Sequence, residues 1–234
     1  MKKILILVLV VLTLVGILAS PIFNISHIEI TNIDELSYQQ VLMMIDEPAN
    51  IFAFNRRRAS DAIILNPYVY HVAISKNYIS REINIHITER STIGYVRFSE
   101  GQYLRVDNTG LVLSVVNYRQ LPRPVVAGLD FTTFRVGEPL EVAAYGVFNT
   151  IATMAGLFLT YDIDDYALQI DITDPANLRL NYGNIIISLG QPRDLEEKLR
   201  ILIPILPEIA PFRNIGGHLN ISDINSQWIF SILT

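Results

Sequence analysis

The chain contains no cysteine among its 234 residues. Disulfide scaffolds, thiolate nucleophiles and cysteine metal sites are therefore excluded. Charge is also scarce, because only 18% of the residues are charged, the formal net charge is −5, and no large basic block is present. Binding to nucleic acid depends on clustered Lys and Arg that neutralise phosphates, so this class of function is disfavoured.

Catalytic motifs are lacking as well. The serines occur in no Gly-x-Ser-x-Gly setting, no glycine-rich phosphate loop is present, and the four histidines are scattered at positions 27, 71, 86 and 218. The acidic stretch 162–165, with Asp171 and Asp174 after it, lacks the glycine and the closing glutamate of an EF-hand loop. It is interpreted as a charged turn beside a strand, with an ion site as the alternative. We therefore expect no enzyme, no cofactor and no metal.

One long apolar run stands at the start of the chain. Lys2 and Lys3 precede an uncharged stretch, 4–23, that would span about 30 Å as a helix, which is close to the thickness of a bilayer core. Cytoplasmic flanks are enriched in Lys and Arg, so the N-terminus is predicted to be cytoplasmic and the rest extracytoplasmic. Residues 1–22 are predicted to form a short stub and a transmembrane anchor. A cleaved signal peptide is the alternative, although Leu18-Ala19-Ser20-Pro21 is a poor cleavage site.

The next segment, 23–90, predicts a small folded unit in the order β-α-α-β-β. Alternating apolar residues indicate a strand over 23–30, and Ser37 and Asn55 are placed to cap two short helices. A hairpin follows within Asn66–Val96. This order gives a three-stranded sheet with both helices on one face. Arg56-Arg57-Arg58 opens the second helix and is interpreted as a solvated face, with contact to anionic lipid or cell-wall polymers as the alternative.

Alternation also predicts the register of the hairpin. If Lys76 pairs with Arg81, six apolar side chains point to one side: Ile74 with Ile83, Val72 with Ile85, and Tyr70 with Ile87. His71 then lies opposite His86 on the face without helices. Two solvated polar residues are the ordinary interpretation; a metal pair or a response to pH near 6 is the alternative. Protonation of both should weakly destabilise the hairpin, because like charges would face each other.

The remainder, 91–234, predicts a strand-rich unit with flanking helices. Strands are expected over 102–106, 111–114, 124–127, 167–172, 177–181, 185–189, 219–223 and 228–233. One helix is expected over 140–159. A second is expected to open at Gly190-Gln191-Pro192 and to be kinked or ended by Pro204. The fold class is therefore α+β, with a mixed β domain after the smaller unit.

Several of these motifs occur in the order found in one family. They are Asn66-Pro67-Tyr68-Val69, Glu89-Arg90 before Ile93-Gly94-Tyr95-Val96, Val106-Asp107-x-x-Gly110-x-Val112-Leu113, Leu121-Pro122 with Gly128, and Leu189-Gly190 before Glu197-Lys198-Leu199. With the apolar start of the chain, they resemble the FtsQ/DivIB family of bacterial division proteins across nearly the whole sequence.

The resemblance implies a transmembrane helix over 1–22, a POTRA domain over 23–90 and a β domain over 91–234. It also implies a non-enzymatic scaffold of the divisome that binds FtsL-like and FtsB/DivIC-like bitopic proteins and supports septum formation. In the family the last strands of the β domain pair with a segment of the FtsB-type partner. The residues that match this edge are Leu219, Asn220, Ile221, Ser222, Asp223, Trp228 and Phe230. The alternatives are a POTRA protein of a secretion or outer-membrane assembly system and a secreted enzyme.

Overall fold

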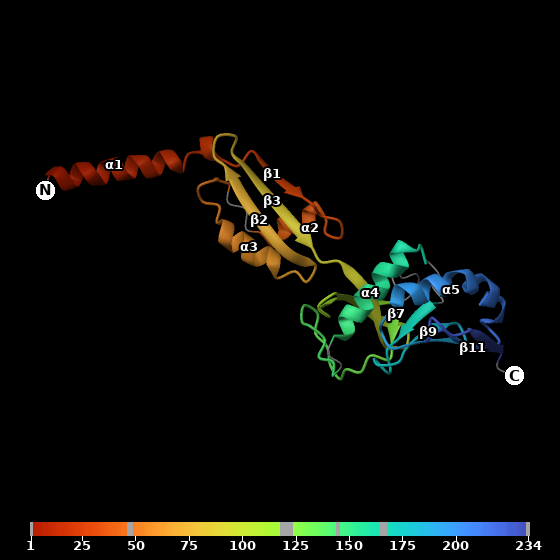
Figure 1. Cartoon of the computed structure of the whole chain (residues 1–234). Coiled ribbons are helices and arrows are strands. Elements are labelled where there is room, and N and C mark those ends of the chain that lie inside the picture. The colour runs from red at the N-terminus through yellow and green to blue at the C-terminus, as the bar shows by residue number, and fades with distance from the viewer. Residues whose placement is uncertain (1, 46–48, 118–123, 144–145, 164–167, 233–234) are drawn as a thin grey trace. The chain divides into compact units, whose positions relative to one another are not determined.

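The computed structural model describes residues 2–45, 49–117, 124–143, 146–163 and 168–232. They form two compact units, Met1–Arg90 and Ser91–Thr234, each with its own hydrophobic core (Figure 1). The fold is α+β, as predicted.

The first helix, α1, covers Lys2–Leu18 and has no buried residue. Its aliphatic side chains are exposed on every side of the helix. Across the described residues, we find no helix that is both long and apolar enough to cross a membrane. A short turn of 3-10 helix, η1 (Pro21–Phe23), leads into the first sheet.

The first unit contains a three-stranded sheet in the order β1-β3-β2. Strand β1 (His27–Thr31) is parallel to β3 (Glu82–Glu89), which is antiparallel to β2 (Val69–Asn77). The helices are α2 (Tyr38–Met44) and α3 (Arg56–Ile64). The predicted β-α-α-β-β order is confirmed, although β1 begins at His27 rather than at residue 23.

Both predicted helix caps are present. The Ser37 hydroxyl accepts from the Gln40 amide, while the Gln40 side chain accepts from the Ser37 amide, so α2 begins with a capping box. The Asn55 side chain accepts from the Arg58 amide at the start of α3. Each cap satisfies helix amides that have no partner within the helix. Local chemistry in the sequence therefore determines where these two helices start.

The predicted register of the hairpin is wrong by two residues. Lys76 pairs with Ile83 rather than Arg81, and Asn77 pairs with Glu82. A shift of two keeps every side chain on its own face, so the apolar alternation does not distinguish the two registers. The turn determines the register. The Asn77 side chain accepts hydrogen bonds from the amides of Ile79 and Ser80, so the hairpin loop begins directly after Asn77.

The predicted histidine pair does not form. His71 lies opposite Thr88, and His86 lies opposite Ala73. The His86 Nδ1 is instead 3.0 Å from the Thr31 hydroxyl on the other neighbouring strand. The register also shifts between Val69 and His71, and this bulge leaves Tyr70 exposed and off the core face. The expected charge repulsion between the two imidazoles therefore has no geometric basis.

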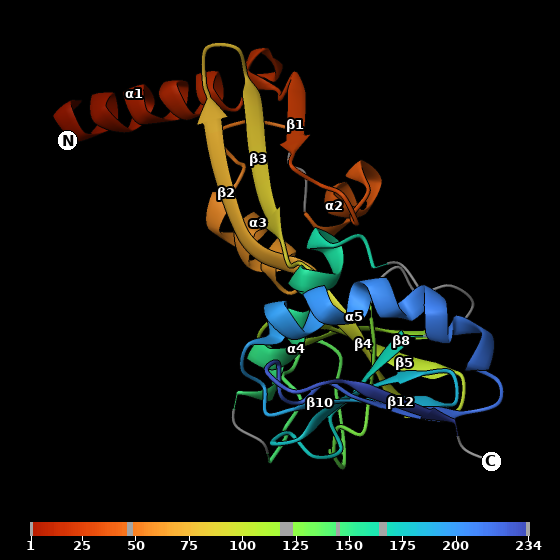
Figure 2. The same ribbon diagram turned by 45° about the vertical axis from the view of Figure 1, so that its right-hand side comes forward.

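The second unit contains a nine-stranded mixed sheet in the order β12-β11-β10-β9-β8-β7-β4-β5-β6. Its strands are β4 (Thr92–Ser99), β5 (Gln102–Asp107), β6 (Val112–Asn117), β7 (Val125–Ala127), β8 (Leu168–Asp171), β9 (Leu178–Tyr182), β10 (Ile185–Gly190), β11 (Gly217–Asn220) and β12 (Ile229–Ile232). Helices α4 (Val147–Thr160) and α5 (Leu195–Ile209) pack on it and share one core with its strands (Figure 2).

Both helices of this unit depart from the predicted bounds. Helix α4 begins at Val147, and Leu140 instead donates its amide to the Gly110 carbonyl. Helix α5 begins at Leu195, so Pro192 lies outside it, and the helix continues through Pro204 to Ile209. Pro204 and Pro207 are both exposed, so water can replace the hydrogen bonds that the prolines cannot donate. Pro204 therefore does not end the helix, and the alternative that it kinks the helix stays a prediction.

Candidate partner-binding edge

Strand β12 lies at one end of the nine-stranded sheet. It pairs antiparallel with β11 and with no other strand in the described residues. In this register Leu219 is opposite Phe230, and Asn220 is opposite Ile229. An edge strand presents unpaired N–H and C=O groups along its outer side, and an incoming extended segment can satisfy them.

The seven residues predicted from the sequence divide between a buried and an exposed set. Leu219 and Ile221 are 0% and 2% exposed and belong to the core. Strand β11 pairs with both β10 and β12, so the predicted residues on β11 do not form the outermost strand. Phe230 is half-buried against the same core, with its ring 5.6 Å from that of Phe212. Trp228 is 45% exposed.

Sequence reasoning missed two apolar side chains on the edge. Ile229 and Ile232 lie on β12 and are 69% and 45% exposed. With Trp228, which precedes the strand, they leave apolar side chains exposed along a strand that contains no charged residue. Residues 229 and 232 are three apart and so lie on opposite faces of the strand, and alternation alone therefore did not predict that both are exposed.

The loop before β12 is held by short-range hydrogen bonds. The Asp223 carboxylate accepts from the Asn225 amide at 3.0 Å and from the Ser226 hydroxyl at 2.8 Å. The hydrogen bond from the Asn225 backbone is the largest cause that lowers the pKa of Asp223 below its ordinary value. The Asn220 side chain accepts from the Ser222 amide. These bonds define the path from β11 to the edge strand.

The comparisons with known proteins point in one direction. Residues 23–90 match the family described as "POTRA domain, FtsQ-type". The chain is 27% identical over 214 residues to "Cell division protein DivIB" of Clostridium tetani, which covers 90% of this chain and 80% of the relative. It is 23% identical over 226 residues to the protein of the same name from Clostridium botulinum, strain Hall, which covers 94% and 88%. The chain is therefore similar to FtsQ/DivIB proteins over most of its length.

Both of these relatives are named as cell division proteins. The POTRA unit of this chain is the three-stranded sheet with α2 and α3. The motif Glu197-Lys198-Leu199, one of those that carry the resemblance, lies in α5 beside the loop that leads to the edge. The structure gives this motif a specific role.

Lys198 is buried, although sequence reasoning treated it only as part of a motif. It is 2% exposed, and its ammonium donates to the Gln191 carbonyl at 2.9 Å. Burial lowers its pKa, while the nearby charges of Asp194 and Asp223 oppose that shift. Lys198 therefore ties α5 to the Gln191 carbonyl, with the Asp223 carboxylate among the charges that act on it. The sequence already indicated this burial, because Lys198 stands three residues after Leu195 and therefore lies on the apolar face of the helix.

The acidic clusters of the second unit provide no metal or catalytic site in the described residues. In the described residues no group of three His, Cys, Asp or Glu side chains is placed to hold a metal ion. Asp171 accepts from the Thr173 amide and hydroxyl, and Asp174 accepts from the Ala176 amide, so both act as turn residues. Asp164 and Asp165 lie outside the described residues.

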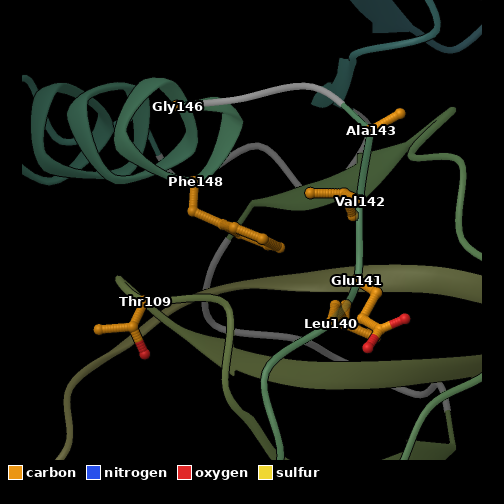
Figure 3. A pocket seen from close by; sticks show the side chains of 7 residues that line it. All are labelled: Thr109, Leu140, Glu141, Val142, Ala143, Gly146 and Phe148. Atoms are coloured by element: carbon orange, nitrogen blue, oxygen red, sulfur yellow. The ribbon is translucent and has the colours of Figure 1, made fainter.

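A pocket of about 570 Å³ lies beside the start of α4. Figure 3 shows the Phe148 ring and Val142 directed into it, with Glu141 at its lower side. Glu141 is the single ionisable group among the seven lining residues. A lone carboxylate in an open, mostly apolar hollow provides no acid–base pair.

Proposed function

We propose that this protein is a bitopic membrane scaffold of the bacterial divisome. Residues 1–22 form the cytoplasmic stub and the anchor, 23–90 the POTRA domain, and 91–234 the β domain that ends in the partner-binding edge. The extracytoplasmic domains bind FtsL-like and FtsB/DivIC-like single-pass proteins and thereby support septum formation. Similarity to cell division proteins over most of the chain and the exposed apolar surface of α1 support this proposal.

The open edge at β12 is the observation that carries the proposal. A strand from a small partner would extend the sheet by one position, with backbone hydrogen bonds supplying affinity and alternate side chains supplying specificity. Trp228, Ile229 and Ile232 would lose their contact with water on binding. Large exposed aromatic side chains often contribute most to interface energy, so Trp228 is the expected anchor. Residues Leu219 and Ile221 act indirectly, because they hold β11 and its loop on the core.

Site-specific photo-crosslinking of the full-length chain in dividing cells tests this proposal. One variant carries a photoreactive residue in place of Ile229, and a control carries it in place of Val115 on β6, the opposite end of the same sheet. Both positions are exposed, at 69% and 41%. We expect adducts with a small single-pass division protein from position 229 only. Equal adducts from both positions, or adducts from position 115 alone, would contradict the edge mechanism.

A further inference from the structure

Three segments of the POTRA unit meet at the end of its sheet where the chain leaves α1. They are residues 20–26, the loop 49–54 and the hairpin turn 76–82. Ile51 donates its amide to the Phe23 carbonyl, and Ser26 donates to the Arg81 carbonyl. Figure 2 shows the β2–β3 turn and the start of β1 at this same end. We refer to this end, with Ile22, Phe23, Phe52, Tyr78 and Ile79, as the hairpin tip.

The hairpin tip exposes a cluster of apolar and aromatic side chains. Ile79 is 96% exposed, Ile22 69%, Tyr78 51% and Phe52 42%. The rings support one another: Phe23 meets Phe52 edge-on at 5.1 Å between centroids, and Phe52 stacks on Tyr78 at 5.3 Å. These contacts fix the aromatic side chains in an outward position instead of letting them collapse onto the core.

The tip is joined closely to the end of α1. The Asn50 side chain donates to the Leu18 carbonyl at 2.8 Å, and the Arg81 guanidinium donates to the Ile22 carbonyl at 3.1 Å. Leu18 is the last residue of the apolar helix. The exposed apolar residues of the tip are therefore held within a few residues of the segment proposed as the membrane anchor.

The charges around the tip are mostly basic. Segments 20–26, 49–58 and 76–82 contain Arg56, Arg57, Arg58, Lys76 and Arg81, and one acidic residue, Glu82, whose carboxylate accepts from the Ser80 hydroxyl. The Lys76 ammonium turns inward and donates to the carbonyls of Ile51 and Phe54. The three arginines at the start of α3 are exposed. Arg57 has Asp61 at 3.9 Å, and both of those side chains are largely in water, so the pair is weak.

We propose that the hairpin tip is a lipid-contacting surface that inserts into the headgroup region of an anionic bilayer. This inference deepens the proposed function and rests on its membrane anchor. Tyrosine and other amphipathic rings favour the membrane–water interface. Basic side chains beside an apolar patch are attracted to the surface potential of anionic lipids. The tip combines both properties at the one end of the domain that a membrane anchor would bring to the lipid.

The absence of cysteine permits a direct test with the full chain. The variant Ile79→Cys is labelled with an environment-sensitive fluorophore and reconstituted into vesicles of phosphatidylcholine, with or without phosphatidylglycerol. The matched control is Leu65→Cys, which is 82% exposed and follows the opposite end of α3, about 13 Å along that helix. Lipid-borne nitroxides and aqueous iodide then report which side of the interface each label occupies.

We expect the label at position 79 to shift to the blue and to be quenched by lipid nitroxide, and the label at position 65 to be quenched by iodide. Two further changes separate insertion from mere proximity. Phe52→Ser with Tyr78→Ser should return the label at 79 to water, while Arg56→Gln with Arg57→Gln should weaken insertion only in vesicles that contain phosphatidylglycerol. Unchanged unfolding midpoints would show that these variants are folded.

The outcomes for the anchor and for the tip are distinguishable. Carbonate extraction of the same vesicles reports on the anchor: release of the chain would overturn the proposed function itself. Retention of the chain with iodide-accessible labels at both 79 and 65 would overturn the tip inference alone. Lipid quenching at 79 that survives both pairs of substitutions would also overturn it, because neither the rings nor the arginines would then be responsible.

Discussion

The two sheets end in edge strands of very different character. Strand β2 of the POTRA unit is nine residues long, carries a bulge beside Tyr70, and points Lys76 toward the core side of the sheet. Strand β12 of the second unit has four residues and no bulge. The stretch 228–232 contains neither a charged residue nor a proline. Bulges and inward-pointing charges are the devices by which proteins prevent edge-to-edge pairing.

The difference between the edges indicates which edge strands are protected against pairing with another strand and which are accessible to one. The other outer strand of the large sheet, β6, is partly covered, because Val112 exchanges hydrogen bonds with residues 137 and 138. In the described residues β12 therefore has a less protected edge than β2 or β6. Protection of β2 and of part of β6, together with exposed apolar side chains on β12, favours strand addition at β12 over these two edges. Four changes test this contrast, beginning with the largest expected effect.

Gly217→Ala should displace the edge strand β12 and so reduce partner binding. A Cβ at Gly217 would lie 2.6 Å from the Phe230 ring and 3.0 Å from the Ser231 carbonyl, so β12 must move. Overpacking of this kind costs about 1–3 kcal/mol, and we expect partner capture to fall by about tenfold or more. Chemical denaturation and the crosslinking yield from position 229 measure the two effects.

The matched control for that change is Gly156→Ala in α4. No atom lies within 4 Å of a Cβ at this position. Alanine is the better helix former, so the variant should gain up to about 1 kcal/mol. Normal capture by a Gly217→Ala chain that has lost the expected stability would show that the position of β12 does not matter for binding.

Lys76→Met should weaken the protected edge. The change removes two hydrogen bonds from the ammonium to the carbonyls of Ile51 and Phe54, for a loss of about 1–3 kcal/mol in the unfolding free energy. Removal of the inward charge should also increase self-association of the chain. Analytical ultracentrifugation and urea unfolding provide the measurements. Arg57→Met, at an exposed site, is the control and should alter stability by no more than about 0.5 kcal/mol.

The contrast between the edges was only partly predictable from the sequence. The caps at Ser37 and Asn55 and the order of elements in the POTRA unit depend on neighbouring residues, so sequence patterns predict them. The hairpin register depends on which residue closes the turn, and a two-residue shift leaves the apolar faces unchanged. Sequence alternation therefore predicts the buried face but not which residue opposes Lys76.

At the candidate site, too, features set by neighbouring residues were predictable from the sequence, and features set by long-range packing were not. The last segments of the chain were predicted to form strands, and Trp228 and Phe230 do lie at or beside β12. The sequence does not reveal that β11 is paired on both sides, because that depends on the parallel crossover through α5 that places β11 beside β10. Burial of Lys198 depends on the same crossover. Long-range packing decides which of two apolar strands becomes the edge.

Ile229→Lys should sharpen the comparison by adding to β12 the kind of protection that β2 already has. Ile229 is 69% exposed, so the fold should lose no more than about 0.5 kcal/mol. A charge on the edge opposes strand addition, and we expect capture to fall by about tenfold. Ile186→Lys is the control, because Ile186 is exposed on β10, inside the sheet. If both variants capture the partner normally, the edge of β12 is not the binding site.

The pH dependence of stability should separate the half-buried Lys76 from the buried Lys198, with the smallest effect of the four. Burial lowers the pKa of Lys76 and of Lys198 below the ordinary value of 10.5. Between the lowered value and 10.5 the unfolded chain holds more protons than the folded chain, so the unfolding free energy rises with pH in that window and is flat below it. Lys76→Met and Lys198→Met should each flatten part of that rise in urea unfolding between neutral pH and 10.5. A slope that neither substitution changes would mean that both ammonium groups are solvated in the folded protein, and the inward charge of β2 would no longer distinguish its edge from that of β12.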